Sequence, residues 1–307
     1  MAFLPVPQPY DFVRSTERFR AYGRDLATAW SDSALHRVVA GREVRIAAAR
    51  GGVLLTAQGG DPLARISAAQ TPEGVRLRRP QAGLTPNLGV DDDARDHVSF
   101  LLGLPFDLAA FWAWAQAEAV LAGLAQPLAG FRPPLQPDPW EALVTSITAQ
   151  QVSLHSAFAV RARLVERFGT RHQHAWSFPA RASVADARED DLVRLGFSRR
   201  KAEYVLGLAR SDLDPAALDS LADEDVVAAL TAQRGLGRWS ADWFLARALA
   251  RPSAWPAGDL GLRKAVSHFY GEGHMLSEPE VREIGERFGA WRNVAAHMLL
   301  AGMRLHG

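Results

Sequence analysis

One short stretch of the chain groups the residue types that bind anions. It is "TAQRGLGRWSADWF", residues 231–244, in which two apolar helical patterns meet at a three-residue turn, Gly-Leu-Gly, between Arg234 and Arg238. The first amides of a helix have no partner within it, and the helix dipole adds to their preference for negative charge. A duplex phosphate suits such a turn. An ordinary pair of packed helices, with glycine as a cap and arginine at the surface, also fits the spacing.

A single carboxylate follows this turn. Asp259 lies in "WPAGDLGLRKA", between Gly258 and Gly261 and directly before another helical pattern. An aspartate at such a position is usually a helix N-cap. The spacing alone therefore leaves both a structural and a chemical role open for Asp259.

The elements that carry these residues change in type along the chain. Up to about residue 90, β-branched runs separated by Gly-rich turns in "HRVVAGREVRIAAARGGVLLTAQGG", and the alternating "GVRLRRP", predict short antiparallel strands. From Asp91 onward, apolar residues recur at three- and four-residue spacing. We predict an α+β protein, with a small N-terminal α/β domain over 1–90 and a mostly helical region over 91–307. The helical region includes the hairpin (221–250) and the Asp259 loop (256–262).

Several boundaries can be predicted within the helical region. The Pro-rich segment 130–140 and the segment 169–185 are expected to be connections without regular structure. The sequence "SEPE", from Ser277 to Glu280, is expected to form a capping box at the start of a helix.

Composition excludes several classes of site. The chain of 307 residues contains no cysteine, which excludes disulfides, thiolate metal sites and cysteine-ligated iron–sulfur clusters. Its net charge of +1 does not by itself indicate nucleic-acid binding. No apolar run reaches the length of a membrane-spanning helix, and the start "MAFLPVPQPYDF" does not resemble a signal peptide. We expect a cytoplasmic protein without membrane association.

Four ordered motifs together resemble the helix-hairpin-helix DNA glycosylase superfamily, over roughly residues 130–300. They are "PDPWEALVTSITAQQVSLHSAFAVRARLVERFG", "LVRLGFSRRKAEYVLGLA", "RGLGRWSADW" and "GDLGLRKA". The DNA-3-methyladenine glycosylase II family, which also has an N-terminal α/β domain, is the nearest match. The resemblance implies a monomeric enzyme that binds double-stranded DNA containing damaged bases and removes an alkylated base, such as 3-methyladenine, after flipping its nucleotide out of the duplex.

The resemblance also assigns roles to individual residues. Asp259 is the expected catalytic carboxylate, which stabilises the oxocarbenium-like sugar or activates water. Gln151 is the expected wedge that fills the gap in the duplex. The expected base pocket consists of Trp239, Trp243, Gln150, Leu260 and Leu300. The expected phosphate-binding hairpin consists of Arg234, Gly235, Leu236, Gly237 and Arg238.

Two departures from related enzymes refine this expectation. Superfamily members that also cleave the DNA backbone have a lysine where this chain has Trp239, and an indole cannot form a Schiff base. We therefore expect base removal without strand cleavage. Leu300 replaces a tryptophan common in the family, and Leu260 and Gly261 replace bulkier residues, so the pocket is expected to be more open.

No organic cofactor is implied, but the family's hairpin can hold a structural monovalent cation. The matching backbone carbonyls are those of Thr231, Gln233 and Gly235. The histidines show no metal-binding spacing with nearby carboxylates, and we interpret them as ordinary polar residues; those considered are His155, His172, His174 and His297.

Two other functions fit parts of the pattern. The hairpin alone is compatible with a non-catalytic DNA-binding module, and the fold is compatible with a glycosylase for oxidised purines, although Trp239 in the lysine position disfavours the latter. Among alkylated bases, 3-methyladenine, 7-methylguanine, ethenoadenine and 1-methyladenine remain alternative substrates.

Overall fold

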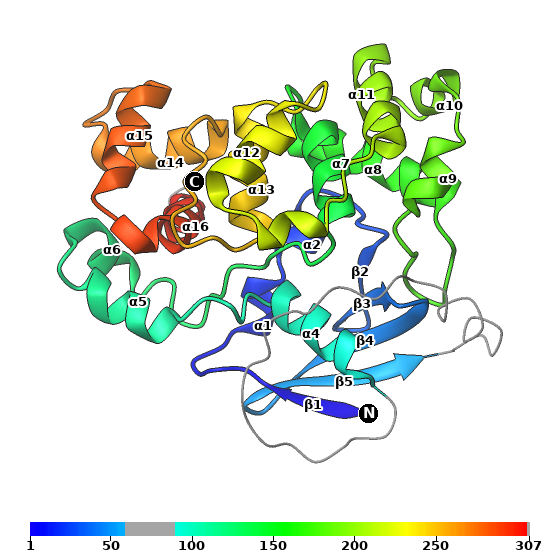
Figure 1. Ribbon diagram of the computed structural model, residues 1–307. Helices are drawn as coiled ribbons and strands as arrows, with labels where there is room; N and C mark the ends of the chain where they lie inside the picture. Colours follow the sequence, from blue (N-terminus) through cyan, green and yellow to red (C-terminus); the bar gives the residue numbers. More distant parts are fainter. Residues whose placement is uncertain (59–89, 306–307) are drawn as a thin grey trace. The chain divides into compact units, whose positions relative to one another are not determined.

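The computed structural model describes residues 1–58 and 90–305, which form two compact units (Figure 1). Each unit consists of three segments that are separate in the sequence. Unit 1 consists of Met1–Gln8, Thr16–Ser99 and Thr148–Leu218, and unit 2 consists of Pro9–Ser15, Phe100–Ile147 and Asp219–Gly307. The boundary at residue 90 falls at the edge of the segment 59–89, which lies outside the described residues. The division into 1–90 and 91–307 therefore stays a prediction.

Unit 1 contains an antiparallel sheet of five strands in the order β1-β5-β4-β3-β2. The strands are β1 (Ala2–Pro5), β2 (Thr28–Ser31), β3 (Ala34–Val39), β4 (Arg42–Ala49) and β5 (Gly52–Gln58). Leu35 pairs with Ile46, which pairs with Leu55, and none of the three side chains is exposed. The predicted antiparallel sheet is confirmed, and β1 and β2 add edges that the sequence pattern did not indicate. The strand predicted at "GVRLRRP" lies outside the described residues.

Strand β3 is buried on both faces of the sheet. Arg37, only 3% exposed, donates hydrogen bonds to Thr28 Oγ1 at 2.9 Å and to His97 Nε2 at 2.8 Å. His97 lies on helix α4 (Asp92–Leu101), which therefore covers this face. On the other face, His36 is 1% exposed and lies 2.9 Å from Glu43 Oε1. Burial on both faces explains why β3 shows no alternation of buried and exposed residues.

The remaining elements of unit 1 are helical. They are α2 (Arg18–Ala21), α8 (Leu154–Phe168), α9 (Arg181–Ala185), α10 (Glu189–Arg194) and α11 (Arg199–Arg210), followed by a 3-10 turn at Ala217–Ser220. The prediction of a connection over 169–185 is wrong for its last five residues, which form α9. Val184 is fully buried, and the Arg181 guanidinium donates to Ala209 O at 3.0 Å, so contacts with α11 stabilise this short helix.

Unit 2 is helical and has its own hydrophobic core. Its helices are α1 (Phe12–Ser15), α5 (Leu108–Ala115), α6 (Ala119–Leu124), α7 (Pro139–Ala149, whose last two residues belong to unit 1), α12 (Asp223–Thr231), α13 (Arg238–Arg247), α14 (Leu260–Tyr270), α15 (Glu278–Glu286) and α16 (Arg292–Met303), with a 3-10 turn at Gly289–Trp291. Phe111, Trp255 and Phe288 are central members of the core. The change from strand to helix along the chain confirms the predicted fold class.

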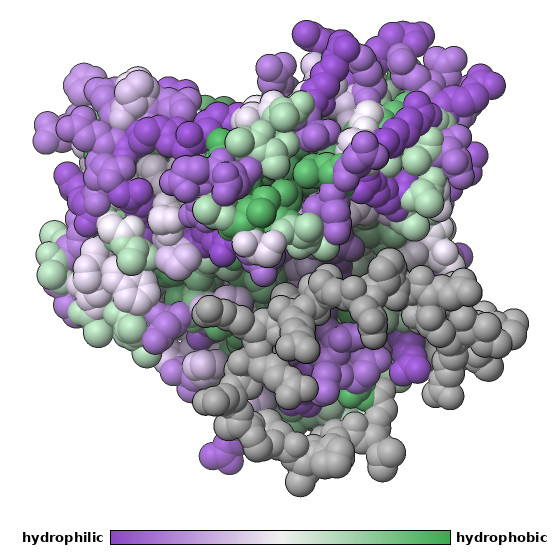
Figure 2. Space-filling model, viewed as in Figure 1, coloured by the Kyte–Doolittle hydropathy of each residue, from purple (hydrophilic) through white to green (hydrophobic). Residues whose placement is uncertain are grey.

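The predicted helix boundaries of unit 2 agree with the structure in part. Residues 131–138 have no regular structure, but Pro139 and Trp140, the last two residues of the predicted connection, begin α7. At α15, Ser277 N–H donates to Glu280 Oε2 at 2.7 Å, and the capping box is complete. Val281 and Gly285 form the buried side of α15, whereas Figure 2 shows its outer surface as predominantly hydrophilic.

None of the helices within 1–58 and 90–305 combines the length and hydropathy needed to cross a membrane. The cytoplasmic location stays a prediction.

Candidate active site

Helices α12 and α13 pack against each other as the predicted hairpin, but their connection is longer than the sequence suggested. It comprises residues 232–237 rather than three residues. Gln233 N–H donates to Leu230 O at 3.0 Å and Leu236 N–H donates to Gln233 O at 3.1 Å, so two successive turns are needed. Gly235 has φ +92°, which favours glycine, and Leu236 is only 4% exposed. The buried leucine side chain anchors the connection to the unit.

The N-terminus of α13 has the features of an anion site. Its N-cap is Gly237, an exposed residue whose backbone is extended (φ −110°, ψ −175°) and which provides no side-chain cap. A Cβ added there would meet no heavy atom within 4 Å. The first amides of α13 therefore have no side-chain cap and open space beside them, and the exposed side chains of Arg234 and Arg238 flank them.

A buried carboxylate holds Arg238 in place. Asp242, whose side chain is 5% exposed, accepts a hydrogen bond from Arg238 Nε at 2.7 Å and lies 3.6 Å from Arg282 Nη2. Burial raises the pKa of Asp242, and the two arginines oppose this effect. Arg282 also donates to Glu278 at 2.8 Å, and a Cβ at Gly258 would lie 3.2 Å from Glu278 Oε2. These contacts connect the start of α13 with the loop that precedes Asp259.

Asp259 uses both carboxylate oxygens. It is the N-cap of α14, where Oδ1 accepts the Leu262 N–H at 2.9 Å, and Oδ2 accepts the indole Nε1–H of Trp239 at 3.1 Å. The structural role as a cap and the position beside the hairpin are therefore both present. The two donors hold the half-buried carboxylate in one orientation. Its contact with Trp239 could not be inferred from spacing.

Gly261 lies close to this carboxylate, and Leu300 lies close to Gly261. A Cβ at Gly261 would lie 3.0 Å from Asp259 Oδ1 and 3.4 Å from Leu300 Cδ2, so any larger residue would crowd the acid. Leu300 packs against the core of unit 2, and Leu260 is 57% exposed. Trp243 lies one helical turn after Trp239 on α13 and is partly buried. The roles of Leu260, Leu300 and the two tryptophans in a base pocket stay predictions.

The two glutamines belong to unit 1 and follow α7. Gln150 is partly buried, whereas Gln151 is exposed and has φ +54°, a left-handed conformation that is uncommon for residues other than glycine. Val152 and Leu154, directly after it, are each 46% exposed. The loop thus presents one strained polar residue and two apolar side chains to solvent. Wedge and pocket roles for the glutamines stay predictions.

The turn between α12 and α13 is compatible with carbonyl coordination of a monovalent cation. Thr231 ends α12, and its hydroxyl donates to Val227 O at 2.7 Å. Gln233 O accepts one N–H and retains a second lone pair. The cation at Thr231, Gln233 and Gly235 stays a prediction.

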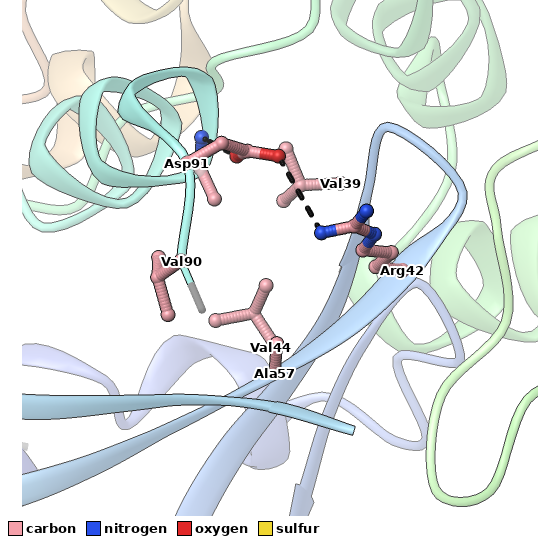
Figure 3. Close-up of a pocket in the computed structure, with 7 residues that line it drawn as sticks. Val39, Arg42, Val44, Ala57, Val90 and Asp91 are labelled. Atoms are coloured by element: carbon pink, nitrogen blue, oxygen red, sulfur yellow. Dashed lines mark hydrogen bonds and ion pairs between the residues drawn. The ribbon is translucent and has the colours of Figure 1, made fainter. Parts of the chain in front are cut away.

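A small pocket in unit 1 contains none of these residues. Figure 3 shows it between the sheet and the start of α4, with Arg42 Nη1 3.9 Å from Asp91 Oδ2. Its lining residues are Val39, Arg42, Val44, Ala57, Val90, Asp91 and Ala94.

Residues 144–290 match the model of the HhH-GPD superfamily of base excision DNA repair proteins. This range contains the hairpin, Trp239, Asp259 and both glutamines. The matched segment belongs to this superfamily. The predicted resemblance to the DNA-3-methyladenine glycosylase II family is confirmed by relatives that carry the name of that enzyme.

The chain is 29% identical to DNA-3-methyladenine glycosylase of Bacillus subtilis over 201 residues, which are 63% of this chain and 66% of the relative. It is 29% identical to DNA-3-methyladenine glycosylase 2 of Escherichia coli over 181 residues, which are 56% of this chain and 60% of the relative. The chain thus spans less than two thirds of the length of either relative. It shares the fold of a 3-methyladenine DNA glycosylase from Archaeoglobus fulgidus, with a TM-score of 0.80, 23% identity and 98% of each chain covered.

Proposed function

We propose that this protein is a monofunctional DNA glycosylase that hydrolyses the N-glycosidic bond of alkylated bases, such as 3-methyladenine, in double-stranded DNA. The observation that carries the proposal is the carboxylate of Asp259, fixed between the cap of α14 and the indole N–H of Trp239. The names of the relatives, DNA-3-methyladenine glycosylases of two bacteria, support the reaction class.

The chemistry assigned to Asp259 follows from the bond that must break. When the bond between C1′ and the base nitrogen breaks, its electron pair leaves with the base and the sugar becomes oxocarbenium-like. A carboxylate held in a fixed position stabilises that positive charge without having to reorganise. Water then adds to C1′ and loses a proton, which completes the hydrolysis. Asp259 either stabilises the cation or accepts this proton.

A purine that is methylated at N3 or N7, such as 3-methyladenine, needs little further help from the protein. It is already cationic in the nucleotide, so it leaves as a neutral base and no general acid is required. A cation is attracted to the face of an electron-rich ring. Trp239 and Trp243, one turn apart on α13, are the aromatic side chains that we assign to the extruded base.

The hairpin is assigned to the DNA backbone. The first amides of α13 and the exposed Arg234 and Arg238 suit a phosphate group, a contact that positions the protein without reading sequence. Gln151 is assigned to the gap left by the flipped nucleotide, because it is exposed on a loop with apolar neighbours. All these residues belong to one chain, so the proposal requires only a monomer.

The substitution Asp259→Asn tests the proposed chemistry. Asparagine caps a helix about as well as aspartate, so the melting temperature should change little. Without the negative charge, the single-turnover rate of methylated-base release from alkylated duplex DNA should fall at least about 100-fold. The released bases are measured by chromatography, with an 8-oxoguanine duplex as a second substrate.

Wild-type rates in the variant would contradict the role of Asp259. Release of 8-oxoguanine alone would indicate an oxidised-purine glycosylase, and no release from any lesion a non-catalytic module.

The absence of strand cleavage is tested by borohydride trapping. A lyase forms a Schiff base between a protein amine and the abasic sugar, and borohydride reduces it to a stable cross-link. The chain has only two lysines, and one of them, Lys201, donates to Thr148 O at 2.9 Å in unit 1. We expect no cross-link to abasic DNA and no strand break until alkali is added. A bifunctional glycosylase is the positive control, and a trapped complex would overturn the monofunctional assignment.

The phosphate contact is tested at Gly237, where the backbone accommodates any residue. Gly237→Asp and Gly237→Asn both provide a good N-cap, so neither should lower the melting temperature. Only aspartate adds a negative charge where a phosphate should bind. Duplex affinity, measured by fluorescence anisotropy at fixed salt, should be at least about tenfold weaker for Gly237→Asp than for Gly237→Asn. Equal affinities of the two variants would place the DNA backbone elsewhere.

A further inference from the structure

Unit 1 contains a compact group of metal-ligating side chains that the proposed reaction does not use. His36 Nδ1 and His174 Nδ1 each lie 2.9 Å from the same oxygen, Glu43 Oε1. One ligand atom from each residue lies within 4.8 Å of those of the other two. The imidazole rings are 4.2 Å apart and inclined by 33°, so they approach the carboxylate side by side. His174 is separated from Glu43 by 131 residues, which explains why sequence spacing did not indicate the group.

Backbone hydrogen bonds orient the Glu43 carboxylate so that its Oε1 oxygen lies beside the two histidines. Its other oxygen, Oε2, accepts the backbone N–H of His174 at 2.9 Å and that of Ala175 at 3.3 Å. Glu43 would therefore bind a metal ion through one oxygen. Strand β4 and the backbone around His174 hold this carboxylate in place before any ion binds.

The group is buried but accessible from one side. His36 and Glu43 side chains are each 1% exposed, whereas that of His174 is 24% exposed. The Nε2 atom of His36 is buried and has no hydrogen-bond partner among the described residues. The His36 ring is therefore positioned through its Nδ1 side, where Glu43 lies. An ion can enter past the partly exposed ring of His174.

We propose that His36, Glu43 and His174 bind a divalent transition metal ion of the zinc class. Two imidazoles and one carboxylate form a common zinc ligand set, with the fourth position taken by water. Ligand bonds of about 2.0–2.2 Å would require the two nitrogens to move only a few tenths of an ångström away from Glu43 Oε1. The ion takes the place of the proton on each Nδ1, and each neutral imidazole then carries its proton on Nε2.

The three ligands come from separate parts of the chain. His36 lies on β3, Glu43 on β4 and His174 in the connection between α8 and α9, so one ion would link three separate parts of unit 1. Asp259 and the hairpin belong to unit 2. None of the three ligands has a role in the proposed glycosylase reaction, so metal binding and base release can be measured separately and either proposal can fail without the other.

Cobalt and zinc titrations of the full chain, prepared without a polyhistidine tag, test the site. The wild type should bind one equivalent of Co²⁺ with the visible absorption of a four-coordinate ion, and Zn²⁺ should displace it. The unfolding temperature should rise when micromolar Zn²⁺ is added. His174→Gln removes one ligand at a partly exposed position and should weaken binding by more than about tenfold. His172→Gln, two residues away in the same connection, is the matched control and should bind as the wild type does.

Three results would overturn the proposal. The wild type could fail to bind Zn²⁺ at micromolar concentration. His174→Gln could bind the ion as tightly as the wild type does, or His172→Gln could lose binding to the same extent as His174→Gln. The first would leave the group as a hydrogen-bonded cluster only. Circular dichroism of each variant ensures that a loss of binding is measured on folded protein. Glu43→Gln, which keeps an acceptor oxygen but removes the charge, provides a second variant and should also lose Co²⁺ absorption.

Discussion

The hydrogen bond between the Trp239 indole and the Asp259 carboxylate connects the two elements on which the proposed activity depends. Trp239 lies in the first turn of α13, two residues after Gly237, and Asp259 caps α14. The proposed phosphate-binding end of α13 and the carboxylate at the start of α14 are therefore held at a fixed separation within unit 2. A capping aspartate is ordinary in itself, and the second donor, Trp239, is what gives this one a defined orientation toward the hairpin.

The packing of unit 2 supports this arrangement. Asp242, Arg238, Arg282 and Glu278 form a chain of charged contacts from α13 to α15, and the last of them lies against Gly258. Because Asp242 is buried, removal of either arginine would leave its carboxylate poorly compensated. Glu278 of α15 thus lies beside Gly258, and Trp239 of α13 contacts Asp259, so the loop is held by contacts from both helices.

Local sequence signals predicted much of this architecture. Three of the sheet's strands, the capping box at Ser277 and the helical hairpin could be inferred because turn residues, caps and periodicity act over a few positions. The length of the hairpin connection could not, since it depends on the buried anchor Leu236. Helix α9 was missed because contacts of Arg181 with α11 stabilise it, and these are distant in sequence.

The geometry of the candidate site was predictable in part. Asp259 and Trp239 were selected from their motifs, but their contact depends on the packing of α13 against α14. The cluster of His36, Glu43 and His174 gave no signal at all, because its members come from two strands and a connection far along the chain. Long-range contacts of this kind arise from tertiary folding, and no spacing rule in a single sequence encodes them.

The substitution Trp239→Phe tests the central claim most directly, since it keeps an aromatic ring at this position and removes the indole donor to Asp259. Hydrogen bonds to charged groups contribute roughly 1.5–3 kcal/mol. If Trp239 positions the carboxylate, the single-turnover rate of 3-methyladenine release should fall about 10- to 100-fold. The affinity for duplex DNA should stay at the wild-type value. A variant that releases the base at the wild-type rate would contradict the claim that this hydrogen bond organises the active site.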